Sequence, residues 1–258
     1  PQQQGGIMTP MLDIRQLTKR YGGLLATDQV SLSLAPGELH AIIGPNGAGK
    51  TTLIGQLGGE VTPDSGSILF DGQDITALLP AQRALRGLAR SYQITSVFPE
   101  FSVLENVALA MQAHRGHSFG FWTPMLRQSE LVEPALRAIE QAGLSHRARA
   151  MVSELAHGER RQLELAMVLV ADPKLLLLDE PMAGMSHQES GNVVRLLQGL
   201  KGRYTMLLVE HDMDAVFALA DRISVLVYGS IIASGTPDEI RNNEEVKIAY
   251  LGDEALPI

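Results

Sequence analysis

The sequence predicts an α/β fold with a mostly parallel sheet, a small antiparallel β subdomain and an inserted helical subdomain. Short, continuously apolar runs alternate with helical patterns along the 258 residues, which is typical of parallel strands that are buried on both faces. Hydrophobic residues make up 45 % of the chain and charged residues 19 %, a composition that argues against disorder and against a coiled coil. A chain of this length can bury one sizeable core and still carry a subdomain.

Four apolar runs are predicted to be strands of the parallel sheet. They are residues 39–43, 175–178, 206–209 and 223–227. Apolar residues recur at i, i+3, i+4 and i+7 within 163–170 and within 193–200, which predicts a helix in each range. The first half also holds three short strand-like pieces, near residues 12–17, 30–34 and 67–70. We expect these pieces to form the antiparallel sheet at the edge.

The predicted domain organisation has three parts. Residues 1–10 are mostly polar and are expected to be an added tag or a disordered start. Residues 11–93 and 158–258 are expected to form the α/β core, with the β subdomain at its edge. Residues 94–157, whose helical pattern is interrupted by Pro and Gly, are expected to form the helical subdomain.

Charge, cysteine content and hydropathy disfavour several classes of function. The 21 Lys and Arg residues against 29 Asp and Glu residues give a net charge of −8, which disfavours a nucleic-acid partner. The absence of cysteine excludes disulfide frameworks, thiolate zinc sites and cysteine nucleophiles. No apolar run approaches the roughly 18 residues that a membrane-spanning helix needs.

The predicted strand 39–43 runs into a glycine-rich loop that matches G-x-x-x-x-G-K-[ST] in full, and a helix-compatible stretch, 51–57, follows. Glycines let several backbone N–H groups point at one anion, and the start of a helix adds its positive end. A glycine-rich turn without a ligand is the alternative, but a chance match has odds of only roughly one in a hundred. The sequence therefore predicts a P-loop NTPase core whose nucleotide-binding residues are Gly44, Asn46, Gly47, Gly49, Lys50, Thr51 and Thr52.

Side chains of this loop and of a second motif suit a magnesium nucleotide. Lys50 can reach the β- and γ-phosphates, and the Thr51 hydroxyl is predicted to bind Mg²⁺. Asp179 and Glu180 directly follow the predicted strand 175–178. Ligands of open parallel sheets lie beyond the carboxyl ends of strands. Asp179 is predicted to hold Mg²⁺, and Glu180 is predicted to polarise the attacking water. The alternative is an acidic cap of the strand, which the phosphate loop disfavours.

The phosphate loop, the Asp179–Glu180 pair and four further motifs occur in the order that is typical of the ATP-binding subunit of an ABC transporter. The sequence resembles that subunit over almost the whole chain. Tyr21 matches the aromatic residue that stacks on adenine, Gln93 the glutamine between core and helical subdomain, and His211 the switch histidine. Residues 155–159 lie where the family has its L-S-G-G-Q signature. The resemblance implies that Gln93 serves the metal and catalysis, that His211 serves catalysis, and that Gly158 contacts nucleotide. Taken singly, Tyr21 has the alternative of a turn aromatic, Gln93 of a loop residue and His211 of a helix start, and the order of the motifs favours the functional interpretation of all three.

Departures from the family pattern point to a subgroup. Ala156 and His157 replace a serine and a glycine of the signature, and Ser186 stands where the family usually has aspartate. With the tail 241–252, these departures resemble the importer ATPases for branched-chain amino acids and for urea or short amides. Residues 114–130 resemble an insertion of the amino-acid importer branch, although packing within the helical subdomain explains them equally well.

The resemblance implies a motor subunit that hydrolyses ATP with Mg²⁺ to power the uptake of a small polar solute such as branched-chain amino acids. It implies a second ATP-binding subunit, identical or different, that faces the first head to tail. It also implies membrane-spanning permease subunits, indirectly a solute-binding protein, and a peripheral location at the cytoplasmic face of the inner membrane. Two alternatives remain open, the ATPase of a lipopolysaccharide exporter and a soluble ABC ATPase without a transport role.

Overall fold

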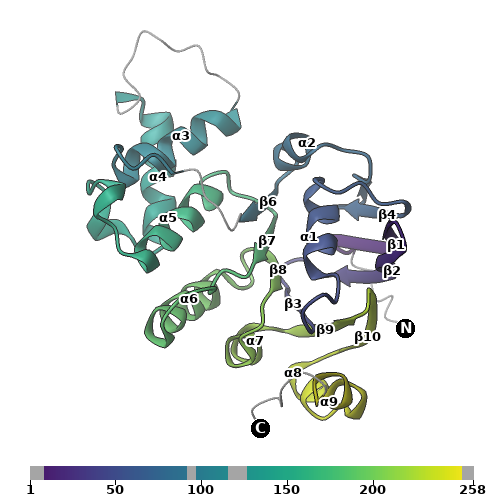
Figure 1. Cartoon of the computed structure of the whole chain (residues 1–258). Coiled ribbons are helices and arrows are strands. Elements are labelled where there is room, and N and C mark those ends of the chain that lie inside the picture. The colour runs from purple at the N-terminus through teal and green to yellow at the C-terminus, as the bar shows by residue number, and fades with distance from the viewer. Residues whose placement is uncertain (1–8, 92–96, 116–126, 252–258) are drawn as a thin grey trace, which may run out of the picture.

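The structure, a computed structural model, describes residues 9–91, 97–115 and 127–251. A six-stranded sheet lies at the centre of the molecule, with a four-stranded sheet on one side and a group of helices on the other (Figure 1). This arrangement confirms the predicted fold class. Most of the predicted disordered start, Gln93 and most of the segment 114–130 lie outside the described residues.

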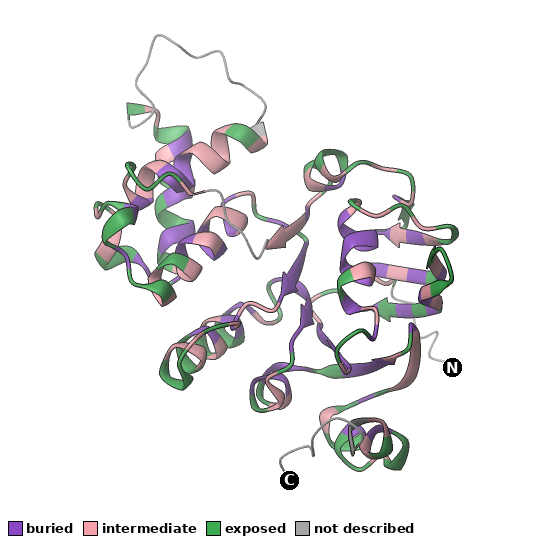
Figure 2. Ribbon diagram, viewed as in Figure 1, coloured by how far each residue is buried: buried purple, intermediate pink, exposed green. Residues whose placement is uncertain are grey.

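The central sheet has the strand order β10-β9-β3-β8-β7-β6. Its strands are β3 (Leu39–Ile43), β6 (Leu88–Ser91), β7 (Leu175–Asp179), β8 (Thr205–Val209), β9 (Arg222–Val227) and β10 (Ser230–Gly235). All neighbours pair in parallel except β10, which runs antiparallel to β9. Every residue of β3, β7 and β8 is buried, which explains why their sequences are continuously apolar (Figure 2). The four predicted strands are confirmed; β6 and β10, which are only partly buried, were not predicted.

The edge sheet is antiparallel, as predicted, and has the order β2-β1-β4-β5. Its strands are β1 (Leu12–Tyr21), β2 (Leu24–Leu34), β4 (Ser65–Phe70) and β5 (Gln73–Asp74). Alternate side chains of this sheet, among them Ile14 and Ile68, pack against Leu53 and Leu57 of α1 (Lys50–Gly58). This packing places the helix that begins at Lys50 between the two sheets.

The helical group consists of α3 (Val103–Arg115), α4 (Ser129–Gln141) and α5 (His157–Leu169), with 3₁₀ turns at Ser145–Arg147 and Val152–Glu154. Buried side chains on the facing surfaces of these helices, including Val107, Ala135 and Leu163, form one apolar cluster. The packing of helices therefore extends past residue 157, at which the prediction ended the helical subdomain. The domain boundaries themselves stay a prediction.

The remaining helices surround the sheets. They are α2 (Pro80–Leu85), α6 (His187–Leu200), α7 (Met213–Leu219), α8 (Pro237–Arg241) and α9 (Glu244–Leu251). Helix α6 confirms the prediction for 193–200, and α5 confirms that for 163–170. None of the helices in the described ranges combines the length and the apolar character that a membrane crossing requires.

Candidate nucleotide-binding site

The glycine-rich loop between β3 and α1 is tied to two segments that are distant in sequence. The carbonyl oxygen of Ala48 accepts a hydrogen bond from Gly229 N at 2.8 Å. The carbonyl oxygen of Gly229 in turn accepts one from Asp28 N, also at 2.8 Å. The turn between β9 and β10 therefore joins the loop to strand β2, so the backbone of the loop is held in place by neighbouring strands.

Two glycines of the loop are required by the close approach of other backbone atoms. A Cβ atom at Gly44 would lie 2.0 Å from the carbonyl oxygen of Leu226, and one at Gly49 would lie 2.1 Å from that of Ala26. A Cβ atom at Gly47 would meet no heavy atom within 4 Å. The loop is thus packed tightly on one side and open on the other, which suits a cradle of backbone N–H groups for an anion. The residues present fit a phosphate group.

Lys50 lies at the base of the loop and is buried, with 8 % of its surface exposed. Its ammonium group donates hydrogen bonds to the carbonyl oxygens of Gly44 at 2.6 Å and of Pro45 at 3.1 Å. Burial lowers the pKa of Lys50, while the negative charges of Glu180 and Asp179 act in the opposite direction. The structure therefore brings the predicted lysine and both predicted carboxylates into one electrostatic neighbourhood.

Asp179 ends β7 as a buried carboxylate, and its Oδ2 atom accepts a hydrogen bond from Arg90 Nη2 at 2.9 Å. The Nη1 atom of Arg90 lies 2.7 Å from Glu60 Oε2, so one guanidinium links two carboxylates. The described residues contain no cluster of three or more His, Asp or Glu that would cage a metal ion without a substrate. Mg²⁺ is commonly held by one or two protein oxygens together with phosphates and water, and the oxygens of Thr51 and Asp179 fit that chemistry.

Glu180 and His211 follow neighbouring parallel strands and therefore lie at the same edge of the sheet. Glu180 has a φ of 47°, in the left-handed region, and its N–H donates to the carbonyl oxygen of Val209 at 2.8 Å. Such a conformation costs a non-glycine residue about 1–3 kcal/mol and persists only where surrounding contacts determine it. The side chain of His211, two residues after Val209, is 64 % exposed. Both side chains are thus directed by the ends of buried strands.

The other predicted nucleotide contacts have surfaces that a ligand can reach. Tyr21, at the tip of the β1–β2 hairpin, is 48 % exposed, and Lys19 Nζ lies 5.6 Å from its ring centre. Asn46 and Thr51 are exposed, and Thr52 is half-buried. Their roles stay predictions, as does the role of Gln93, which lies outside the described residues.

The signature-like segment begins helix α5. The N–H of Gly158 donates to Glu189 Oε1 at 3.3 Å, and Glu189 Oε2 accepts hydrogen bonds from the N–H and the hydroxyl of Ser186. Ser186 Oγ in turn accepts a hydrogen bond from Glu189 N, which makes Ser186 the N-cap of α6, a role that serine fills as well as aspartate does. Within the described residues, no hydrogen bond or ion pair joins residues 155–159 to the phosphate loop of the same chain. Gly158 therefore stays a prediction as a nucleotide contact.

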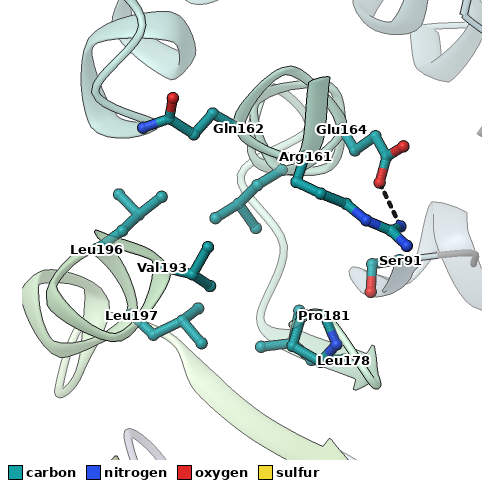
Figure 3. Close-up of a pocket in the computed structure, with 10 residues that line it drawn as sticks. Ser91, Arg161, Gln162, Glu164, Leu178, Pro181, Val193, Leu196 and Leu197 are labelled. Atoms are coloured by element: carbon teal, nitrogen blue, oxygen red, sulfur yellow. Dashed lines mark hydrogen bonds and ion pairs between the residues drawn. The ribbon is translucent and has the colours of Figure 1, made fainter. Parts of the chain in front are cut away.

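A cleft between α5 and α6 is lined in part by Leu178 and Pro181, which flank Asp179 and Glu180 in the sequence (Figure 3). Its walls are mainly apolar and include Leu178, Pro181, Val193, Leu196 and Leu197. On the α5 side, Arg161 forms an ion pair with Glu164 at 2.7 Å. None of the lining residues belongs to the phosphate loop, so this cleft separates α6 from the helical group and does not form the nucleotide site.

Sequence reasoning missed two charged residues of the site, Arg90 and Glu210. Arg90 sits on the unpredicted strand β6, so nothing placed it next to Asp179. Glu210 is 1 % exposed and lies between the apolar end of β8 and His211. An acidic residue directly after a continuously apolar strand was the available signal for Glu210.

Comparison with known proteins decides the family. The family model described as ABC transporter matches residues 27–183, more than half of the chain. The chain belongs to the ABC transporter family. A second model, described as branched-chain amino acid ATP-binding cassette transporter, matches residues 230–255 of this ABC ATPase subunit.

Named relatives cover nearly the full length of the subunit. The high-affinity branched-chain amino acid transport ATP-binding protein LivG of Escherichia coli strain K12 is 40 % identical over 95 % of this chain and 98 % of LivG. BraF of Pseudomonas aeruginosa, which carries the same description, is 38 % identical with the same coverages. The lipopolysaccharide export system ATP-binding protein LptB of Haemophilus influenzae is 34 % identical over 95 % of this chain and 98 % of LptB.

Solved structures agree with this assignment. A nucleotide-free ATP-binding cassette from an ABC transporter superposes with a TM-score of 0.83 at 31 % identity, covering 95 % of this chain and 100 % of that one. An ATP-binding cassette in its ADP conformation gives a TM-score of 0.84 at 30 % identity, with the same coverages. The prediction of an ABC transporter ATP-binding subunit, an ATPase, is confirmed.

Proposed function

We propose that this ABC ATPase subunit hydrolyses MgATP to power the import of branched-chain amino acids. The observation that carries the proposal is the 40 % identity to LivG over 95 % of the chain, together with the match of residues 230–255 to the branched-chain amino acid model. The lower identity of LptB, 34 %, makes lipopolysaccharide export the weaker candidate.

The phosphate loop binds the triphosphate through its backbone N–H groups and through Lys50. Because the lysine ammonium now donates to the carbonyl oxygens of Gly44 and Pro45, a phosphate oxygen competes for a donor that is already aimed into the loop. Tyr21, exposed at its hairpin, stacks on the adenine ring. These contacts hold the γ-phosphate at the carboxyl edge of the central sheet.

Hydrolysis depends on groups at the ends of β7 and β8. Thr51 and Asp179 would hold Mg²⁺, with Gln93 as the further predicted ligand and catalytic contact. When bound, Mg²⁺ neutralises charge on the β- and γ-phosphate oxygens. Glu180 orients a water molecule and accepts its proton, and the exposed imidazole of His211 donates a hydrogen bond to the γ-phosphate.

A second ATP-binding subunit completes the site in this proposal. The segment 155–159 begins an α-helix whose first amides can face phosphate, yet it has no hydrogen bond to the phosphate loop of its own chain among the described residues. A head-to-tail partner would bring such a segment, with Gly158, to the nucleotide. The partner is either a second copy or a related subunit.

An apolar surface on the helical group suits contact with permease subunits at the cytoplasmic face of the inner membrane. Phe98 and Phe101 are 50 % and 40 % exposed, and their ring centres lie 5.4 Å apart. Met151, 36 % exposed, lies next to them through the backbone bridge between Ser102 and Met151. Exposed apolar clusters of this kind commonly mark interaction sites. A solute-binding protein would deliver the solute to the permease.

The test is transport by the assembled complex. The subunit is purified with its membrane partners, reconstituted into liposomes that enclose MgATP, and supplied with solute-binding protein and radiolabelled leucine. We expect ATP-dependent accumulation of leucine that unlabelled isoleucine or valine reduces. Accumulation of urea in place of leucine, or extraction of lipopolysaccharide without any uptake, would overturn the choice of solute.

A further inference from the structure

Glu210 is a buried carboxylate that receives hydrogen bonds from two separate loops. Its Oε1 atom accepts from Met182 N at 2.9 Å. Its Oε2 atom accepts from His211 N at 2.9 Å and, at the longer distance of 3.4 Å, from Asp212 N. The described residues place no lysine or arginine in an ion pair with Glu210, whose partners among them are backbone N–H groups and the imidazole Nδ1 of His211 at 3.7 Å.

The two loops are those that carry the candidate catalytic groups. Met182 lies two residues after Glu180, and the hydrogen bond from Ala183 N to Glu180 O closes a tight turn around it. His211 directly follows Glu210. The side chain of Glu210 therefore spans from the turn that follows Glu180 to the turn that contains His211.

Helix capping does not explain this arrangement. Helix α7 has its own N-cap, because Asp212 Oδ1 accepts a hydrogen bond from Ala215 N at 3.1 Å. By contrast, Glu239 is a helix-capping glutamate, which bonds to Thr236 N at its own helix end and is exposed. Glu210 instead joins segments 28 residues apart in the chain.

We propose that Glu210 is a positioning residue that fixes Glu180 and His211 relative to each other, an inference that rests on the proposed function of those two groups. A buried carboxylate is stable only while its oxygens accept hydrogen bonds, so its two loops are held in one arrangement. Catalytic groups tolerate displacements of well under 1 Å before the rate falls. Glu210 acts on the rate of hydrolysis and leaves the binding of ATP to the phosphate loop unchanged.

Three variants of the full chain distinguish the effect of the length of the Glu210 side chain from the effect of its charge. Glu210→Gln keeps the shape but turns an amide N–H₂ group toward a backbone N–H group. Glu210→Asp keeps the charge but is one methylene too short to reach both loops. We expect kcat to fall on the order of 10- to 100-fold in both, with the dissociation constant for ATP unchanged. Glu239→Gln, the matched control, keeps the kcat of the wild type.

Amide hydrogen exchange provides a readout that needs neither nucleotide nor metal. In the wild type, we expect the amides of Met182 and His211 to have matching protection factors, each corrected for the intrinsic exchange rate at its position, because one carboxylate protects both. In Glu210→Gln, both should exchange faster while strand β3 keeps its protection. Should a variant fail to fold, the comparison of the two protection factors in the wild type still tests the proposal.

Three results would overturn the proposal. They are a wild-type kcat in Glu210→Asp, unchanged exchange at Met182 and His211 in Glu210→Gln, and unrelated protection factors of these amides in the wild type. The first would mean that charge alone matters at this position. Failure of the proposed function is distinguishable, because it would appear as normal hydrolysis by Glu180→Gln and would leave the exchange results readable.

Discussion

Arg90 Nη2 lies 2.9 Å from Asp179 Oδ2, which gives the predicted metal-binding carboxylate a positive partner within its own chain. The side chain of Asp179 is 5 % exposed and that of Arg90 13 % exposed, so the pair is largely shielded from water. The ion pair therefore keeps a buried negative charge stable at the end of β7.

Removing only Arg90 should destabilise the protein. Arg90→Met leaves the buried carboxylate of Asp179 without its ion-pair partner, and we expect the free energy of unfolding to fall by about 3–5 kcal/mol. Adding Asp179→Asn to this variant should recover much of the lost stability, because the unpaired negative charge at residue 179 is then removed. Urea unfolding of the two single variants and the double variant measures the coupling. Additive effects of the two changes would contradict the assignment.

Glu180→Gln should separate binding from hydrolysis. Glutamine cannot accept the proton of the attacking water, so we expect hydrolysis to fall by about 10²–10⁴-fold while ATP still binds. Lys50→Ala should instead lose ATP affinity, because the ammonium that is aimed into the loop is removed. Equilibrium binding of ATP and single-turnover hydrolysis distinguish the two outcomes. Wild-type turnover in Glu180→Gln would refute the role of Glu180.

Replacement by alanine should change the free energy of unfolding in opposite directions at Gly49 and Gly191. At Gly49 the new Cβ atom would lie 2.1 Å from the carbonyl oxygen of Ala26, so Gly49→Ala should destabilise the fold and lower ATP affinity. Gly191 lies inside α6, where a Cβ atom meets no heavy atom within 4 Å. We expect Gly191→Ala to raise the free energy of unfolding by about 0.5–1 kcal/mol. Thermal and urea unfolding of both variants provide the comparison.

The loss of folding stability at acidic pH should depend partly on Glu38. Desolvation alone would raise the pKa of Glu38, but hydrogen bonds from His40 Nδ1 at 2.9 Å and from Ala35 N at 2.8 Å outweigh it, so its pKa lies below 4.5. A carboxyl whose pKa is lower in the folded state stabilises the fold above the unfolded pKa. This contribution disappears as the pH falls from about 4.5 through the folded pKa.

Glu38→Gln should therefore lose less stability on acidification below pH 4.5 than the wild type does. Unfolding free energies measured from neutral pH down through this range provide the test. Glu133→Gln, at an exposed position of α4, is the control and should follow the wild-type curve. A wild-type acid dependence in Glu38→Gln would contradict the role of Glu38.

Several features were predictable because their signals are local. The loop that ends in Lys50 carries its chemistry in consecutive residues, and the turn and the helix start that it needs lie within the same stretch. Strands β3, β7 and β8 are buried on both faces, so each appears in the sequence as an uninterrupted apolar run. The position of Glu180 follows directly from the end of such a run.

Other parts of the site depend on which strands become neighbours. Strand β6 has only one fully buried residue, so its sequence contains no apolar run that would predict a strand. Its pairing with β7 nevertheless places Arg90 beside Asp179. Likewise, Met182 and Glu210 meet because β7 lies next to β8.

The sequence by itself determined the α/β class, the phosphate loop and the position of two carboxylates at the end of a buried strand, because each depends on the periodicity or spacing of nearby residues. Only the tertiary structure decided the partners of those carboxylates. Asp179 pairs with Arg90, and the turn after Glu180 is linked by Glu210 to the turn that contains His211. Such contacts depend on strand order and on the direction of buried side chains, which are settled by packing between segments that are distant in the chain.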